Sequence, residues 1–173
     1  MKIKYISVTF LFLLLFSLIG CSQKSDNNVE TTTYILVRHS EKDTSDSLNK
    51  NPNLTEAGKK RSQNLVHFLT NVQIDEIYST QYQRTLQTAE PLAKDRNIEI
   101  TLYDPQKLYD AEFQKQTKGK ISVIIGHSNT TPTFVNKILK QKKYDDIDEN
   151  DYSKLFVIKI TGDVITDMVF NLN

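Results

Sequence analysis

The chain has 173 residues, of which 38% are hydrophobic and 25% charged, so its length and composition fit one globular domain and exclude a disordered chain. Its formal net charge is +1, and without residues 1–20, which contribute Lys2 and Lys4, it holds 20 basic and 21 acidic residues. A nearly neutral domain lacks the basic face that nucleic-acid binding needs, so we expect no nucleic-acid partner.

Residues 1–20, MKIKYISVTFLFLLLFSLIG, combine a basic start with a long apolar run and small residues before Cys21, the one cysteine. This pattern predicts a signal peptide. The segment LIGC, residues 18–21, resembles the bacterial lipobox, which implies cleavage before Cys21, lipidation of its thiol and acylation of the new N-terminus. Two alternatives stay open: an uncleaved membrane anchor, for which the run is short, and an ordinary secretory signal.

The lipoprotein interpretation predicts three parts of the chain: a signal peptide over residues 1–20, a lipidated cysteine with a flexible tether over 21–32, and a folded domain over 33–173. The tether sequence carries one large apolar side chain, Val29, and cannot bury a core. Several acyl chains would hold the exported protein stably on a bacterial membrane, in the periplasm or at the cell surface.

The folded domain is expected to alternate strands and helices. Apolar runs predict strands over 33–37, 75–79, 98–103 and 121–125, and a hairpin over 155–160 and 164–170. Helical patterns are predicted from residue 55 onward and over 83–96, 106–115 and 131–140. This order predicts an α/β three-layer sandwich with a mainly parallel central sheet and an antiparallel edge.

The first predicted helix begins after Asn53 or Thr55 as its cap, and its apolar side chains fall on one face: Leu65, Phe68, Leu69 and Val72. His67 points away from this face and is interpreted as a surface residue. The acidic run YDDIDENDY, residues 144–152, has no calcium-loop spacing and is interpreted as a solvated loop.

Cationic side chains follow three of the predicted strands. Arg38 and His39 follow the first, Arg84 follows the second, and His127 follows the fourth. Because the carboxyl ends of parallel strands meet at one edge of a sheet, we expect these four to converge. Guanidinium groups match phosphate oxygens, and a histidine can act as nucleophile. The pattern therefore predicts attack of an imidazole on phosphorus, then hydrolysis of a phosphohistidine; two arginines argue against a metal ion there.

Four segments in this order resemble the motifs of the histidine phosphatase superfamily, also called phosphoglycerate mutase-like. They are VRHSE at 37–41, NLTEAG at 53–58, YSTQYQRTLQTA at 78–89 and IGHSNT at 125–130. The resemblance implies the phosphoglycerate mutase-like fold, no cofactor, His39 as nucleophile, and a phosphate pocket formed by Arg38, Arg84 and His127. It also implies that His127 is protonated when phosphate binds.

Further residues are candidates for substrate binding. Ser128 and Asn129 either donate to phosphate or shape the turn after His127, and Glu41 is a candidate for the mouth of the pocket. Many family members take a proton donor from the segment between the second and third motifs. Here that segment, residues 102–116, is short, and Glu112 is its first candidate, followed by Asp110 and Asp104.

A site without a proton donor favours good leaving groups, such as phosphohistidine. The sequence therefore predicts a metal-independent phosphatase for a phosphate monoester or a phosphoramidate, with a phosphorylated small molecule or phosphoprotein as partner. The alternative is a catalytically weak or inactive lipoprotein that binds phosphorylated ligands. A mutase is disfavoured, because no insert is present to close the site. The sequence leaves the oligomeric state open.

Overall fold

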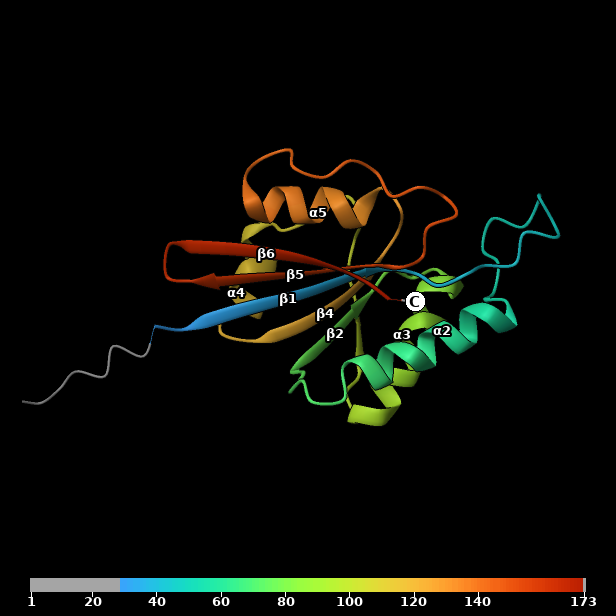
Figure 1. The fold of residues 1–173 in the computed structure, drawn as a ribbon, viewed down its shortest axis with the longest axis horizontal. Helices are drawn as coiled ribbons and strands as arrows, with labels where there is room; N and C mark the ends of the chain where they lie inside the picture. Colours follow the sequence, from blue (N-terminus) through green and yellow to red (C-terminus); the bar gives the residue numbers. More distant parts are fainter. Residues whose placement is uncertain (1–28, 173) are drawn as a thin grey trace, which may run out of the picture.

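A six-stranded sheet with the order β3-β2-β4-β1-β5-β6 forms the middle layer of the domain (Figure 1). The structure is a computed structural model and describes residues 29–172. The first four strands of this order run parallel, while β5 pairs antiparallel with both β1 and β6. The predicted fold class, a mainly parallel sheet with an antiparallel edge, is confirmed. The strands are β1 (Thr31–Arg38), β2 (Glu76–Ser79), β3 (Ile100–Leu102), β4 (Ile121–Gly126), β5 (Lys154–Thr161) and β6 (Val164–Asn171).

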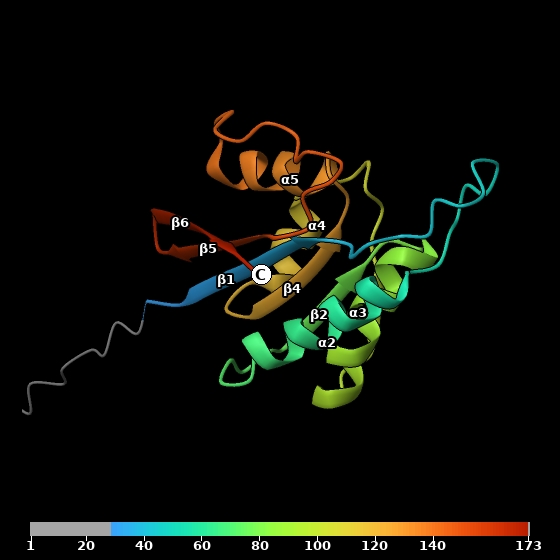
Figure 2. The ribbon, with the colours of Figure 1, turned by 45° about the vertical axis from the view of Figure 1, so that its right-hand side comes forward.

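Helices cover both faces of the sheet, which gives the three layers seen in Figures 1 and 2. One pair, α2 (Glu56–Phe68) and α3 (Gln83–Arg96), lies on one face, and α4 (Ala111–Thr117) and α5 (Thr130–Leu139) lie on the other. Two hydrophobic clusters separate the layers, one between the sheet and each pair of helices.

Strand β1 is buried on both faces because its side chains alternate between the two clusters. Tyr34 and Leu36 pack with α4 and α5, while Ile35 and Val37 pack with α2 and α3. Burial of each such aliphatic side chain stabilises the fold by about 1.5–3 kcal/mol. The strand is therefore a rigid support for the residues that follow its carboxyl end.

Three local predictions were wrong in part. Phe68 is 48% exposed and contacts Phe170, because α2 ends there and the chain turns toward Leu69, which is buried. The predicted strand 98–103 forms only over β3. The predicted helix 106–115 forms instead over α4, because Tyr109 has a left-handed backbone and Asp110 caps the helix by accepting from the Phe113 N–H.

The predicted signal peptide, the lipidation site Cys21 and most of the tether lie outside the described residues. Within residues 29–172, no helix has both the length and the apolar character needed to cross a membrane.

Candidate active site

Three of the four predicted cationic residues line one open cavity at the carboxyl edge of the sheet. His39 directly follows β1, His127 follows β4, and Arg84 lies in the first turn of α3 after β2. These strands are neighbours in the sheet, so their ends meet. The cavity has a volume of about 670 Å³, and the two imidazole rings lie 5.5 Å apart in it.

One ring nitrogen of His39 is hydrogen-bonded to the backbone, and the other keeps its lone pair for attack on a substrate. Its Nδ1 lies 2.7 Å from the Ser40 carbonyl oxygen, and because that oxygen can only accept, Nδ1 carries the proton. Nε2 therefore keeps its lone pair. Burial lowers the pKa of His39 to about 3, and the Arg84 and Arg38 charges act in the same direction. The ring is neutral at pH 7, which is the state that a nucleophile needs.

His127 is fixed in the opposite tautomer. Arg84 Nη2 donates to its Nδ1 at 3.4 Å, so the proton lies on Nε2, which donates to Thr80 Oγ1 at 3.1 Å. Burial and the Arg84 charge lower the pKa of His127 to about 4. Thr80 is fully buried and also bonds Thr85 Oγ1 at 2.8 Å. Thr80 thus orients the second histidine. The sequence analysis did not predict this role, although Thr80 directly follows β2, where site residues are expected.

Arg84 has donors available for an anion. Its guanidinium carbon lies 4.4 Å from the Tyr82 ring centroid, and this cation–π contact helps to position the group. Its Nε is buried without a hydrogen-bond partner. A buried N–H of a charged group is costly to leave unpaired, and a phosphate oxygen would satisfy it.

Arg38 lies behind the cavity wall rather than in it. Its Nη1 donates to the carbonyl oxygens of Asp148 and Asp151 at 2.7 and 3.0 Å, and its Nη2 donates to Glu149 Oε2 at 2.9 Å. The Tyr152 ring covers the guanidinium at 4.2 Å. The side chain is 1% exposed, and its Nε has no partner.

The acidic segment 144–152 therefore has a different place from the one predicted. It is not only a solvated loop, because its carbonyl groups, the Glu149 carboxylate and the Tyr152 ring hold Arg38. Strand β5 explains this: it runs antiparallel to β1 with Leu155 opposite Val37, so the segment before β5 must lie at the carboxyl end of β1. The sequence pattern of a hairpin does not reveal that pairing.

The other predicted substrate-binding residues divide into two groups. Ser128 and Asn129 line the cavity. Ser128 Oγ lies 2.5 Å from Glu149 Oε1, and the Asn129 side chain caps α5 by accepting from the Thr130 N–H at 2.8 Å. Glu41 instead forms an ion pair with Arg61 at 2.8 Å, and its neighbour Lys42 lines the cavity.

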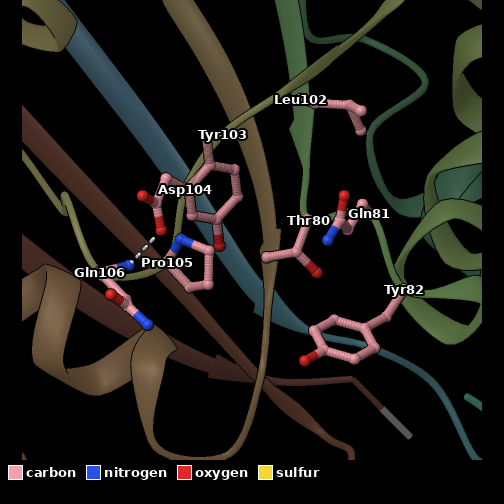
Figure 3. A pocket seen from close by; sticks show the side chains of 8 residues that line it. All are labelled: Thr80, Gln81, Tyr82, Leu102, Tyr103, Asp104, Pro105 and Gln106. Carbon is pink, nitrogen blue, oxygen red and sulfur yellow. Dashed lines mark hydrogen bonds between the residues drawn. The ribbon is translucent and has the colours of Figure 1, made fainter.

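The predicted proton donor Glu112 lies on α4 and accepts from Gln116 Nε2 at 2.9 Å; it does not line this cavity. Asp104 lines a second cavity of about 480 Å³, which shares Tyr82 and Pro105 with the first. Figure 3 shows this second cavity, with Tyr82 on one side and Tyr103, Asp104 and Pro105 opposite. Among residues 29–172, no group of three or more His, Cys, Asp or Glu side chains is placed to hold a metal ion.

Comparison with known proteins agrees with this geometry. The model of the histidine phosphatase superfamily (branch 1) matches residues 34–105. No curated protein sequence matches the chain.

Solved structures share the fold at low sequence identity. An alpha-ribazole phosphatase from Shigella flexneri has a TM-score of 0.64 at 15% identity, covering 80% of this chain and 96% of its own. A phosphoserine phosphatase from Entamoeba histolytica has 0.62 at 17%, covering 82% and 98%. The protein histidine phosphatase SixA complexed with tungstate has 0.63 at 13%, covering 80% and 96%. The family model spans three of the four motifs and confirms the resemblance to the histidine phosphatase superfamily over residues 34–105, while the solved structures show the shared fold.

Proposed function

We propose that this protein is a metal-independent phosphatase that hydrolyses a phosphate monoester or phosphoramidate through a phosphohistidine on His39. The observation that carries the proposal is the state of His39: a neutral ring, fixed by Nδ1, that lines a cavity shared with Arg84 and His127. Nucleophile and cationic groups are thus held in one place before substrate arrives, which is what phosphoryl transfer chiefly requires.

The reaction follows from these positions. His39 Nε2 attacks phosphorus in line with the leaving group, and the guanidinium of Arg84 stabilises the charge on the equatorial oxygens. The phosphate dianion raises the affinity of His127 for a proton, so this ring becomes a second cation in the complex. Water then attacks the phosphohistidine and releases phosphate.

The similar solved structures are named as an alpha-ribazole phosphatase, a phosphoserine phosphatase and a protein histidine phosphatase. Their likeness to this chain is one of fold, so it supports phosphorylated substrates in general. It does not choose between an ester and a phosphoramidate.

Turnover is tested with p-nitrophenyl phosphate, a chelator and the full-length chain in detergent. The leaving group of this substrate needs no acid, so the assay reports the histidine and arginine residues alone. We expect His39→Ala to abolish p-nitrophenol release, and His67→Ala, a matched change of the exposed histidine on α2, to leave it unchanged. A folded wild type no faster than His39→Ala would contradict the proposal and favour a protein that only binds phosphorylated ligands.

We also propose that the domain is exported and held on a bacterial membrane by lipid at Cys21, from the sequence pattern of residues 1–21. Cys21→Ser is expected to block lipid incorporation and to move the protein out of the lipid-labelled membrane fraction. Unchanged incorporation of labelled fatty acid would contradict the anchor.

A further inference from the structure

The Glu149 carboxylate occupies two donors, the buried guanidinium of Arg38 behind the cavity wall and the hydroxyl of Ser128 in that wall. Its Oε2 accepts from Arg38 Nη2 at 2.9 Å, and its Oε1 accepts from Ser128 Oγ at 2.5 Å. Glu149 also lines the cavity that contains His39, and its side chain is 68% exposed, so it lies at the mouth. One anion whose two oxygens bridge a guanidinium and a hydroxyl imitates the way two phosphate oxygens would bind.

A phosphate ester in this cavity brings a second anion close to the Glu149 carboxylate, because Glu149 and Ser128 both line the cavity. Two anions at hydrogen-bond distance repel each other unless a proton lies between them. The cations around Glu149 are Arg38, Lys42 and Arg84, and Asp146 is the other carboxylate of the cavity wall. In the empty cavity the Ser128 hydrogen bond lowers the pKa of Glu149, so the group is ionised there. An arriving phosphate acts in the opposite direction and favours the protonated carboxyl.

We infer that Glu149 is the proton donor to the leaving group. The segment that supplies this donor in many similar proteins, residues 102–116, places only Pro105 in the cavity wall. Glu149 lies in the cavity wall with a largely exposed side chain, on the solvent side toward which a leaving group departs when the buried His39 attacks. This inference rests on the proposed function and narrows its substrate class to phosphate monoesters of ordinary alcohols, whose alkoxides leave slowly without a proton.

The reaction balances with one proton. A substrate monoanion brings this proton, since the second pKa of phosphate esters is about 6, and passes it to Glu149. As the bond from His39 Nε2 to phosphorus forms, the P–O bond breaks and the leaving oxygen keeps its electron pair and takes the proton from Glu149. The resulting carboxylate then accepts a proton from the attacking water, and the P–N electrons return to His39.

The test compares Glu149→Gln with the wild type on an alkyl phosphate and on p-nitrophenyl phosphate, using the full-length chain. The parameter is kcat/KM, which covers the steps up to P–O cleavage. We expect a loss of about 10²–10⁴-fold on the alkyl phosphate and a change within about threefold on p-nitrophenyl phosphate. An initial burst of p-nitrophenol should appear as well, because the variant lacks the base for hydrolysis of the phosphohistidine.

Matched variants separate a proton donor from other roles. Asp145→Asn makes the same chemical change in the same segment, at an exposed carboxylate paired with Lys142, and should leave both substrates unaffected. Glu149→Asp keeps an acid and should retain part of the alkyl phosphate activity. Glutamine has the same shape as glutamate, and position 149 is largely exposed, so the Glu149→Gln protein is expected to fold normally. A thermal melt checks this.

Four outcomes would overturn the inference. An equal loss on both substrates would mean that Glu149 only positions Arg38, and a gain on both would mean that it blocks the phosphate site. A loss selective for alkyl phosphate in Glu112→Gln or Asp104→Asn, instead of in Glu149→Gln, would assign the donor elsewhere. Absence of His39-dependent turnover in the wild type refutes the proposed function and the Glu149 inference together. If the wild type is active but Glu149→Gln changes kcat/KM for both substrates by the same factor, only the Glu149 inference is refuted.

Discussion

The two buried neutral histidines should make the free energy of unfolding depend steeply on pH between 7 and 5. An unfolded histidine binds a proton with a pKa of about 6.5. Burial lowers the pKa of His39 to about 3 and, with the Arg84 charge, that of His127 to about 4. Below pH 6.5 the unfolded state therefore binds more protons than the folded state, so stability is complete above this pH and falls as pH decreases.

The magnitude follows from these values. Going from pH 7 to pH 5, His39 alone lowers the free energy of unfolding by about 2 kcal/mol. His127 is partly exposed, so solvent screening reduces its share to about 1 kcal/mol. Carboxyl groups titrate mostly below this window and add little to the roughly 3 kcal/mol total.

The measurement is urea unfolding at pH 7, 6 and 5, for the wild type and for His39→Asn combined with His127→Gln. Asparagine keeps a donor near the Ser40 carbonyl, and glutamine keeps one near Thr80 Oγ1. The double variant should lose about 3 kcal/mol less than the wild type between pH 7 and 5. Inorganic phosphate should reduce the loss in the wild type, because a bound anion favours protonated imidazole. Equal losses in wild type and variant would refute the conclusion that the histidines are held neutral.

Other substitutions test individual contacts. Arg84→Met should lower kcat/KM for p-nitrophenyl phosphate by about 10²–10³-fold, and Arg84→Lys should recover only part, since an ammonium lacks the planar fork; unchanged rates in steady-state assays would contradict this role. Thr80→Val removes the acceptor of His127 Nε2 and should lower the free energy of unfolding by about 1–3 kcal/mol in urea titrations, while Thr80→Ser, which keeps the hydroxyl, should not. Gly126→Ala would place a Cβ atom 2.7 Å from Thr131 Oγ1, so a thermal melt should show a destabilisation of about 1–3 kcal/mol. An unchanged melt would show that α5 can shift away from the new methyl group without loss of stability.

The convergence of His39, Arg84 and His127 was predictable because each depends on a local rule. A short apolar run predicts a buried strand, and a polar residue just after such a strand lies at the carboxyl edge of a parallel sheet. The motif spacing then assigned the same three residues independently. The sequence therefore predicted where the strands end and in which order the helices follow. The exception is the region 98–117, where the left-handed backbone of Tyr109 makes the helix begin later than predicted.

The surroundings of Arg38 were not predictable by the same means. They depend on which strand β5 pairs with, and the alternation of apolar residues in β5 and β6 specifies a hairpin but not its neighbour. Once β5 lies beside β1, residues 148–152 reach Arg38 although they are more than a hundred positions away in the chain. Composition gave the opposite indication, because a run rich in Asp and Glu is usually exposed to solvent.

The direction of β1 determines how the cavity would be oriented relative to a membrane that holds the domain at its N-terminus. The strand enters the sheet at Thr31 and ends at Arg38, roughly 23 Å farther along, beside the cavity. An anchor at Cys21 would thus attach at the end of β1 opposite to the cavity, because His39 in the cavity wall follows the far end of this strand, whose course Figure 1 shows. Nine residues lie between Cys21 and Thr31, so the ten Cα–Cα steps from one to the other reach at most about 35 Å, too little for the domain to turn over freely. Under the proposed anchor, the site would therefore draw on solutes of the aqueous phase and not on phosphates of its own lipid surface.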